Sequence, residues 1–77
     1  MAIPRKRALE RLQKLLSRVN EHLAKIAEKP GDPSENHWRH EARNWLDQME
    51  ELLPHVGNKT ASEWQPHIAA CRAKLEA

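Results

Sequence analysis

The sequence predicts an all-α protein: a three-helix antiparallel bundle that runs up, down and up again. Apolar residues recur at alternating steps of three and four along three segments, as they do on the buried face of a helix. Proline and glycine separate these segments, at Pro30–Gly31 and Pro54–Gly57. The chain has 77 residues, enough for one domain, so 1–77 is expected to be a single helical domain.

The first helix is expected at about residues 5–29. Ala8 and Leu15 widen its apolar seam to one side, which favours packing against two neighbours. Pro4 fits at or before the first turn. The seam itself is an unbroken heptad pattern formed by Leu9, Leu12, Leu16, Val19, Leu23 and Ile26.

The second helix is expected at about residues 33–53. Asp32 is a suitable N-cap, Pro33 suits the first helical position, and Glu35 follows three residues after the cap. Pro54 ends the helix because proline cannot donate a backbone hydrogen bond. The seam and the residues that widen it are Trp38, Ala42, Trp45, Leu46, Met49, Leu52 and Leu53.

The third helix is expected at about residues 61–76 and to be the shortest. Thr60–Glu63 is a candidate capping box, whereas Pro66 allows a later start at that residue. The apolar stripe consists of Trp64, Ile68, Cys71 and Leu75. Short connections favour antiparallel neighbours. The alternative architecture is a long helical hairpin that dimerises into a four-helix core, with the short third helix outside.

A basic stripe runs along the outer face of the first helix. Its candidate binding residues are Arg5, Lys6, Arg7, Arg11, Lys14 and Arg18. From Arg7 to Arg18 the stripe covers roughly 16 Å at the helical rise per residue. It predicts a surface for an acidic protein or for phosphates. The formal net charge is only +2, so binding to an acidic protein or to phosphates would have to depend on the local charge of this stripe.

Two features weigh against a nucleic-acid handle. Asp47, Glu50 and Glu51 are expected near the start of the first helix, where they could partly neutralise the stripe. No aromatic residue interleaves with the cations in the sequence, since every Trp falls on a predicted seam as a core residue. The sequence therefore disfavours a stacking platform for single strands.

The outer face of the third helix is rich in alanine. This face consists of Ala69, Ala70, Ala73 and Ala77. Alanine is the best helix former, and a small-residue face also allows another helix to approach closely. Together with the small core that 77 residues provide, this face makes a homodimer or a partner-bound state a hypothesis.

Catalysis and metal binding find little support. His37, His40 and Glu41 share one face of the second helix, with His22 across the hairpin, and form a weaker zinc hypothesis. Cys71 lies on an apolar seam, which predicts an inert thiol. We therefore expect no enzyme activity, no metal and no cofactor.

The expected function is a small helical protein–protein interaction module that is able to self-associate. The alternative is a nucleic-acid-binding protein that uses the basic stripe without reading sequence. The single cysteine indicates a cytoplasmic setting. No leader peptide or apolar membrane-spanning run is present in the sequence, so no membrane partner is expected.

Overall fold

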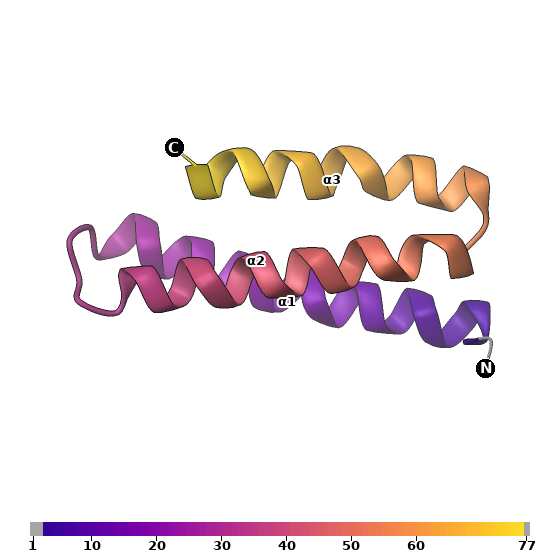
Figure 1. Cartoon of the computed structure of the whole chain (residues 1–77), viewed down its shortest axis with the longest axis horizontal. Helices are drawn as coiled ribbons and strands as arrows, with labels where there is room; N and C mark the ends of the chain where they lie inside the picture. The colour runs from indigo at the N-terminus through magenta and orange to yellow at the C-terminus, as the bar shows by residue number, and fades with distance from the viewer. Residues whose placement is uncertain (1–2, 77) are drawn as a thin grey trace.

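The computed structural model describes residues 3–76, which form three α-helices and one short 3₁₀ turn. The elements are α1 (Arg5–Glu28), α2 (Glu35–Leu52), the 3₁₀ turn η1 (Leu53–His55) and α3 (Asn58–Glu76). Successive helices run antiparallel, with α2 between α1 and α3 (Figure 1). The prediction of an all-α three-helix bundle is confirmed. Within residues 3–76, no helix combines the length and apolarity needed to span a bilayer.

The hairpin between α1 and α2 is built by local capping interactions. Lys29 caps α1 with a backbone hydrogen bond to Lys25, and Gly31 adopts a positive φ of 79° that favours glycine. Asp32 accepts a hydrogen bond from the Ser34 amide at 2.8 Å in the turn before the helix. The N-cap of α2 is Ser34 and not Asp32, so the helix begins two residues later than the predicted start at Pro33. The Asp32 carbonyl also accepts from the Glu35 amide at 2.9 Å, so a tight turn precedes the regular helix.

The predicted start of the third helix was wrong. Helix α3 begins at Asn58, directly after Gly57, whose φ of 86° reverses the chain after η1. The first α-helical hydrogen bond joins the Ala61 amide to the Gly57 carbonyl at 2.9 Å. Thr60 therefore lies inside the helix and does not begin a capping box. With 19 residues against 18 in α2, α3 is not the shortest helix either.

Pro66 lies within α3 without ending it. The proline is exposed, so water can reach the Ser62 carbonyl, which lacks the usual amide donor. The sequence led us to expect a helix boundary at Pro66. It does not reveal whether the carbonyl that loses its hydrogen bond to this residue faces water.

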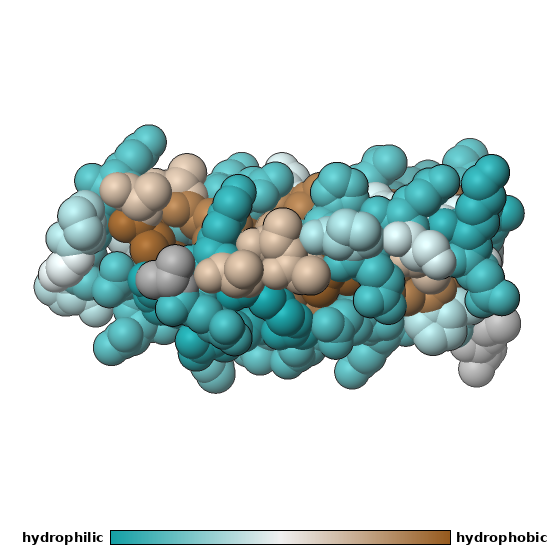
Figure 2. Space-filling model, turned by 90° about the horizontal axis from the view of Figure 1, so that it is seen from above, coloured by the Kyte–Doolittle hydropathy of each residue, from teal (hydrophilic) through white to brown (hydrophobic). Residues whose placement is uncertain are grey.

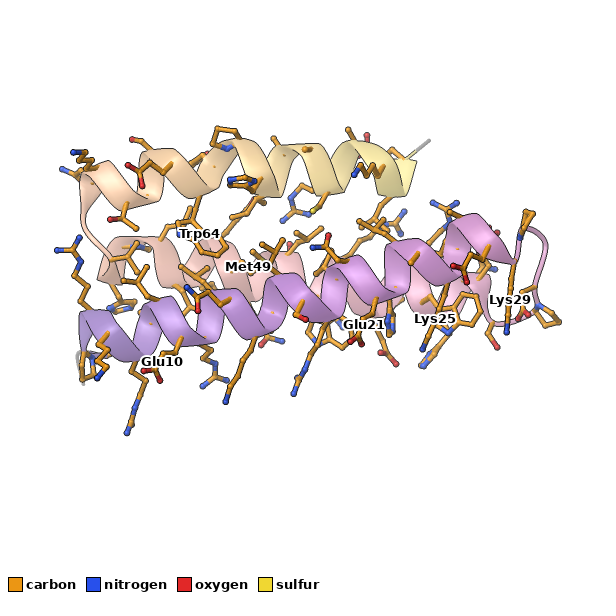
Figure 3. All side chains as sticks on the ribbon, turned by 180° about the vertical axis from the view of Figure 1, so that it is seen from behind. Glu10, Glu21, Lys25, Lys29, Met49 and Trp64 are labelled. Atoms are coloured by element: carbon orange, nitrogen blue, oxygen red, sulfur yellow. The ribbon has the colours of Figure 1, made fainter. Side chains whose placement is uncertain are left out.

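The core lies between the three helices and is apolar throughout. The buried residues are Ala8, Leu12, Leu15, Val19, Ala42, Leu46, Met49, Leu52, Leu53, Val56, Ile68, Cys71 and Leu75. In Figure 3, Met49 and Trp64 point between the helices, whereas Glu10 and Glu21 point outward. Trp64 and Trp45 are only partly buried against the core, so they line its edge instead of filling its centre.

The buried face of α1 is rotated from the predicted heptad seam. Leu12 and Leu15 are buried, whereas Leu9, Leu16 and Leu23 are partly buried. Helix α2 packs closely on the side of α1 that holds Leu15, while α3 packs more closely on α2 than on α1. Figure 2 shows the resulting surface, in which apolar patches stand among hydrophilic side chains beside α3.

Candidate anion-binding groove

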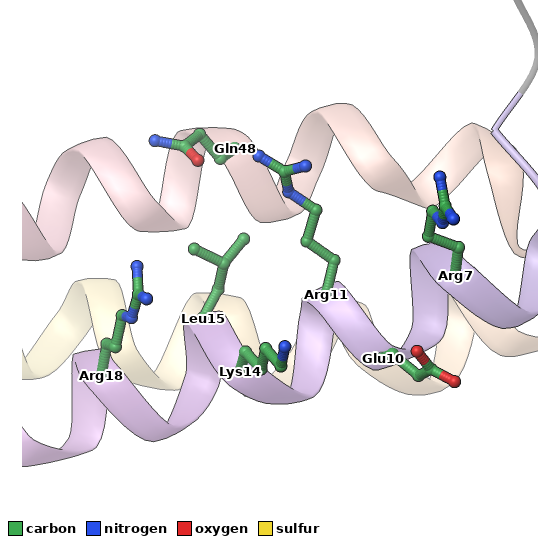
Figure 4. A pocket seen from close by; sticks show the side chains of 7 residues that line it. All are labelled: Arg7, Glu10, Arg11, Lys14, Leu15, Arg18 and Gln48. Carbon is green, nitrogen blue, oxygen red and sulfur yellow. The ribbon is translucent and has the colours of Figure 1, made fainter.

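A hollow of about 340 Å³ lies along the seam between α1 and α2 (Figure 4). Its lining residues are Arg7, Glu10, Arg11, Lys14, Leu15, Arg18 and Gln48. Four of these side chains are cationic and one is acidic. We call this feature the basic groove. Its lining includes four of the six cations of the basic stripe predicted from the sequence, namely Arg7, Arg11, Lys14 and Arg18.

The helical repeat explains why these cations share one surface. Arg7, Arg11, Lys14 and Arg18 are separated by steps of four, three and four, which keep them on one side of α1. In Figure 4 the three arginines extend toward α2, whereas Glu10 points away from it. All four cations are exposed. The surface therefore presents concentrated positive charge to solvent.

The basic groove is not neutralised from within the described chain. Among residues 3–76, no hydrogen bond or ion pair engages Arg7, Arg11, Lys14 or Arg18. Exposed cations of this kind attract an incoming anion at low ionic strength, and Glu10 in the same lining offsets only part of their charge.

The acids of α2 that were expected to offset the stripe are engaged elsewhere. Arg72 of α3 contacts Asp47 at 2.7 Å and Glu50 at 3.1 Å. The hydrogen bond to Asp47 holds the pKa of Arg72 above its ordinary value, with burial opposing and Glu50 adding to the rise. Glu51 is the one of the three that lies near the basic groove, in an adjoining hollow.

The first two predicted stripe residues do not line the basic groove. Arg5 donates from Nη2 to the Thr60 hydroxyl at 3.1 Å, which ties the start of α1 to α3. Lys6 is exposed and lies outside the lining. Sequence spacing did not predict that Arg5 lies apart from the other cations. Its contact with Thr60 depends on where α3 packs.

Two tryptophans of α2 flank the cations of α1, contrary to the sequence expectation. The Arg18 guanidinium lies 5.9 Å from the centre of the Trp45 ring, and Lys25 Nζ lies 5.9 Å from that of Trp38. Cation–π attraction operates at this separation. Part of the signal was present in the sequence, because Arg18 and Lys25 are seven residues apart, as are Trp38 and Trp45. An antiparallel hairpin of the right register brings these two sets opposite each other.

The predicted histidine cluster forms only in part. His22 Nε2 lies 3.0 Å from Glu41 Oε2, and His37 contacts the other oxygen of the same carboxylate. His22 also packs edge-on against Trp45, with ring centres 4.7 Å apart. His40 is exposed and makes none of these contacts. Across residues 3–76, no three or more metal-ligating side chains are arranged to hold a metal ion.

The alanine face and the cysteine occupy opposite sides of α3. Ala69, Ala70 and Ala73 are exposed, and Ala77 lies outside the described residues. Cys71 is buried in the core. Burial raises the pKa of its thiol, with Lys74 opposing that rise, so little thiolate forms at neutral pH.

Comparison with known proteins adds no assignment to this geometry. No family model, curated protein or solved structure matches the chain. The arrangement itself offers charge, an open groove and an aromatic flank, which together suit reversible binding of an anionic surface.

Proposed function

We propose that this chain is a small, non-enzymatic protein-interaction module that binds an acidic segment of a partner protein along the basic groove. One observation carries the proposal. The cations Arg7, Arg11, Lys14 and Arg18 line one hollow and have no acidic partner among residues 3–76. Opposite charge on the partner would steer association and fix its position along α1.

The rigidity of the scaffold supports this proposal. The cations are mounted on a 24-residue helix whose buried face is held by the core, so their spacing is set before a partner arrives. Leu15 and Gln48 lie between them in the floor and wall of the hollow. Preorganised spacing lowers the ordering cost of binding.

A nucleic acid is the second candidate, because Trp45 and Trp38 stand beside Arg18 and Lys25 along the same seam. Three observations rank it lower. The net charge is only +2, and each indole ring is already in contact with a cation of α1. Glu51 also lines the hollow that adjoins the basic groove. Phosphate-tracking proteins usually carry a stronger basic surface.

Two further properties belong to the same proposal. The module is cytoplasmic, in keeping with Cys71 as a buried free thiol in a reducing setting. Self-association would use Leu16 and Leu23, which α3 leaves partly uncovered, or the exposed face Ala69–Ala73. These surfaces are apolar, so self-association would be insensitive to salt, unlike binding in the basic groove.

A charge-reversal pair tests the proposal. The groove variant carries Arg7→Glu, Arg11→Glu, Lys14→Glu and Arg18→Glu. The matched control reverses four exposed cations outside the basic groove and carries Lys29→Glu, Arg43→Glu, Lys59→Glu and Lys74→Glu. Both variants change the net charge equally, so any difference between them reports position. Circular dichroism establishes that each variant is folded.

Binding is measured by the anisotropy of a labelled glutamate-rich peptide and of generic RNA and DNA. We expect the wild type and the control to bind the peptide at about 50 mM salt and more weakly at about 200 mM, with no peptide binding by the groove variant. If the wild type and the control bind RNA or DNA tightly and the groove variant does not, the partner of the basic groove is a nucleic acid and not a protein. Equal loss of peptide binding in both variants would contradict the proposal, because binding would then depend on net charge and not on the basic groove.

A further inference from the structure

A second hollow continues the basic groove toward the N-terminal end of α1. It measures about 540 Å³ and is lined by Ile3, Arg11, Gln48, Glu51, Leu52 and His55. Arg11 and Gln48 line both hollows, so the two hollows adjoin each other along the seam between α1 and α2. In Figure 4, Arg11 and Gln48 lie next to each other across this seam.

The two hollows differ in chemistry. Four cations line the first hollow, whereas, among residues 3–76, Arg11 is the only lysine or arginine that lines the second, with His55 beside it. Glu51 is exposed there and repels further carboxylates. Ile3 is partly buried against the core and Leu52 is buried beside it, so Ile3 supplies most of the exposed apolar surface in a lining that is otherwise formed by Arg11, Gln48, Glu51 and His55.

The second hollow therefore suits a different group from the first. Its volume falls within the range of ligand-binding hollows and accommodates a large aliphatic side chain. A polyanion with uniform charge would place a negative group beside Glu51. A peptide that carries acids at one end and an aliphatic residue at the other avoids this repulsion and covers Ile3.

We propose that the acidic segment bound by the basic groove ends in an apolar anchor residue, and that this residue inserts beside Ile3 and Leu52. This inference rests on the proposed function and specifies the partner's chemistry. The recognised segment has a run of carboxylates for Arg7–Arg18 and a leucine-like side chain immediately beyond that run.

The test uses one set of labelled glutamate-rich peptides with the full-length protein. Leucine is added at the N-terminal or the C-terminal end of the acidic run, and asparagine replaces it in two control peptides of equal length. We expect one leucine peptide to bind about tenfold more tightly than its asparagine counterpart, as burial of an aliphatic side chain implies.

Two isoleucine variants locate the anchor. Ile3→Ser should abolish the leucine gain and leave binding of the asparagine peptides unchanged. Ile26→Ser is the matched control, because Ile26 is also partly buried against the core but lies at the far end of α1. This variant should retain the full gain. Thermal melting verifies that both variants are folded.

The outcomes separate this inference from the proposal beneath it. Equal affinity for the leucine and asparagine peptides would overturn the anchor while leaving the basic groove in place. A leucine gain that survives Ile3→Ser would also overturn it, since the side chain would then bind elsewhere. Failure of every peptide to bind at about 50 mM salt would overturn both the proposed function and the anchor.

Discussion

Arg72 of α3 lies 2.7 Å from Asp47 of α2, and this ion pair links the second and third helices, as does a hydrogen bond from Arg39 to the Leu75 carbonyl. The Arg72 guanidinium also reaches Glu50 at 3.1 Å. Both acids are thereby turned toward α3 and away from the seam that holds the basic groove. Because Arg72 pairs with these two acids, the acids do not pair with the cations of α1, which stay available for a partner.

The first prediction concerns the strength of this link. Arg72→Met should lower the free energy of unfolding by about 0.5–1 kcal/mol, because the pair is partly exposed and screened by water. Urea unfolding of the single variants and of Arg72→Met with Asp47→Asn measures the coupling. A coupling energy near zero would show that this ion pair adds nothing to the attachment of α3.

The second prediction separates neighbouring leucines of α1. Leu15→Ala should cost about 2–5 kcal/mol because Leu15 is buried in the core. Leu16→Ala should cost clearly less because Leu16 is only partly buried. Urea unfolding at two protein concentrations measures both. A larger, concentration-dependent cost at Leu16 would instead favour the alternative in which helical hairpins dimerise through that seam.

The third prediction concerns the proline inside α3. Pro66→Ala should raise the free energy of unfolding by about 1–3 kcal/mol, because alanine restores a helical amide donor and removes the clash with the preceding turn. Gln65→Ala is the control, since Gln65 is the exposed neighbour of Pro66. An unchanged or lowered stability for Pro66→Ala would mean that the helix depends on a bend at this residue.

The fourth prediction concerns the reactivity of Cys71. Burial raises the pKa of this thiol, so the folded protein should form thiolate only at higher pH than the unfolded chain. The stability that this preference for the neutral thiol contributes is fully present below the ordinary thiol pKa and is lost as pH rises through the raised pKa of the folded protein. Iodoacetamide should therefore alkylate the native protein far more slowly than the urea-unfolded protein. Equal rates would place Cys71 in contact with solvent.

The sequence predicted the fold well because its signals are periodic and local. Heptad spacing located α1 and α2, and Asp32 lies in the turn before α2, two residues ahead of the N-cap Ser34. The start of α3 was missed because Pro66 and Thr60–Glu63 resemble boundaries. Whether a proline ends a helix depends on where its lost hydrogen bond points, and that is decided by packing.

The candidate site was predicted along one helix but not across two. Spacing placed Arg11 and Arg18 on one face of α1, and the structure brings both into one hollow. Spacing alone did not identify the partners from α2, because it has to be combined with the register across the hairpin, which depends on the turn. The contact of Trp45 with Arg18 arises from that register, whereas the pairing of Asp47 with Arg72 depends on how α3 packs on α2.

The most direct test of the central claim is a two-dimensional amide NMR titration of the folded protein with a glutamate-rich peptide. The account predicts that the largest shifts fall along the seam, at Arg11, Leu15, Arg18 and Gln48, and that they shrink as salt is added. Shifts concentrated on the alanine face Ala69–Ala73, or no shifts at low salt, would contradict it.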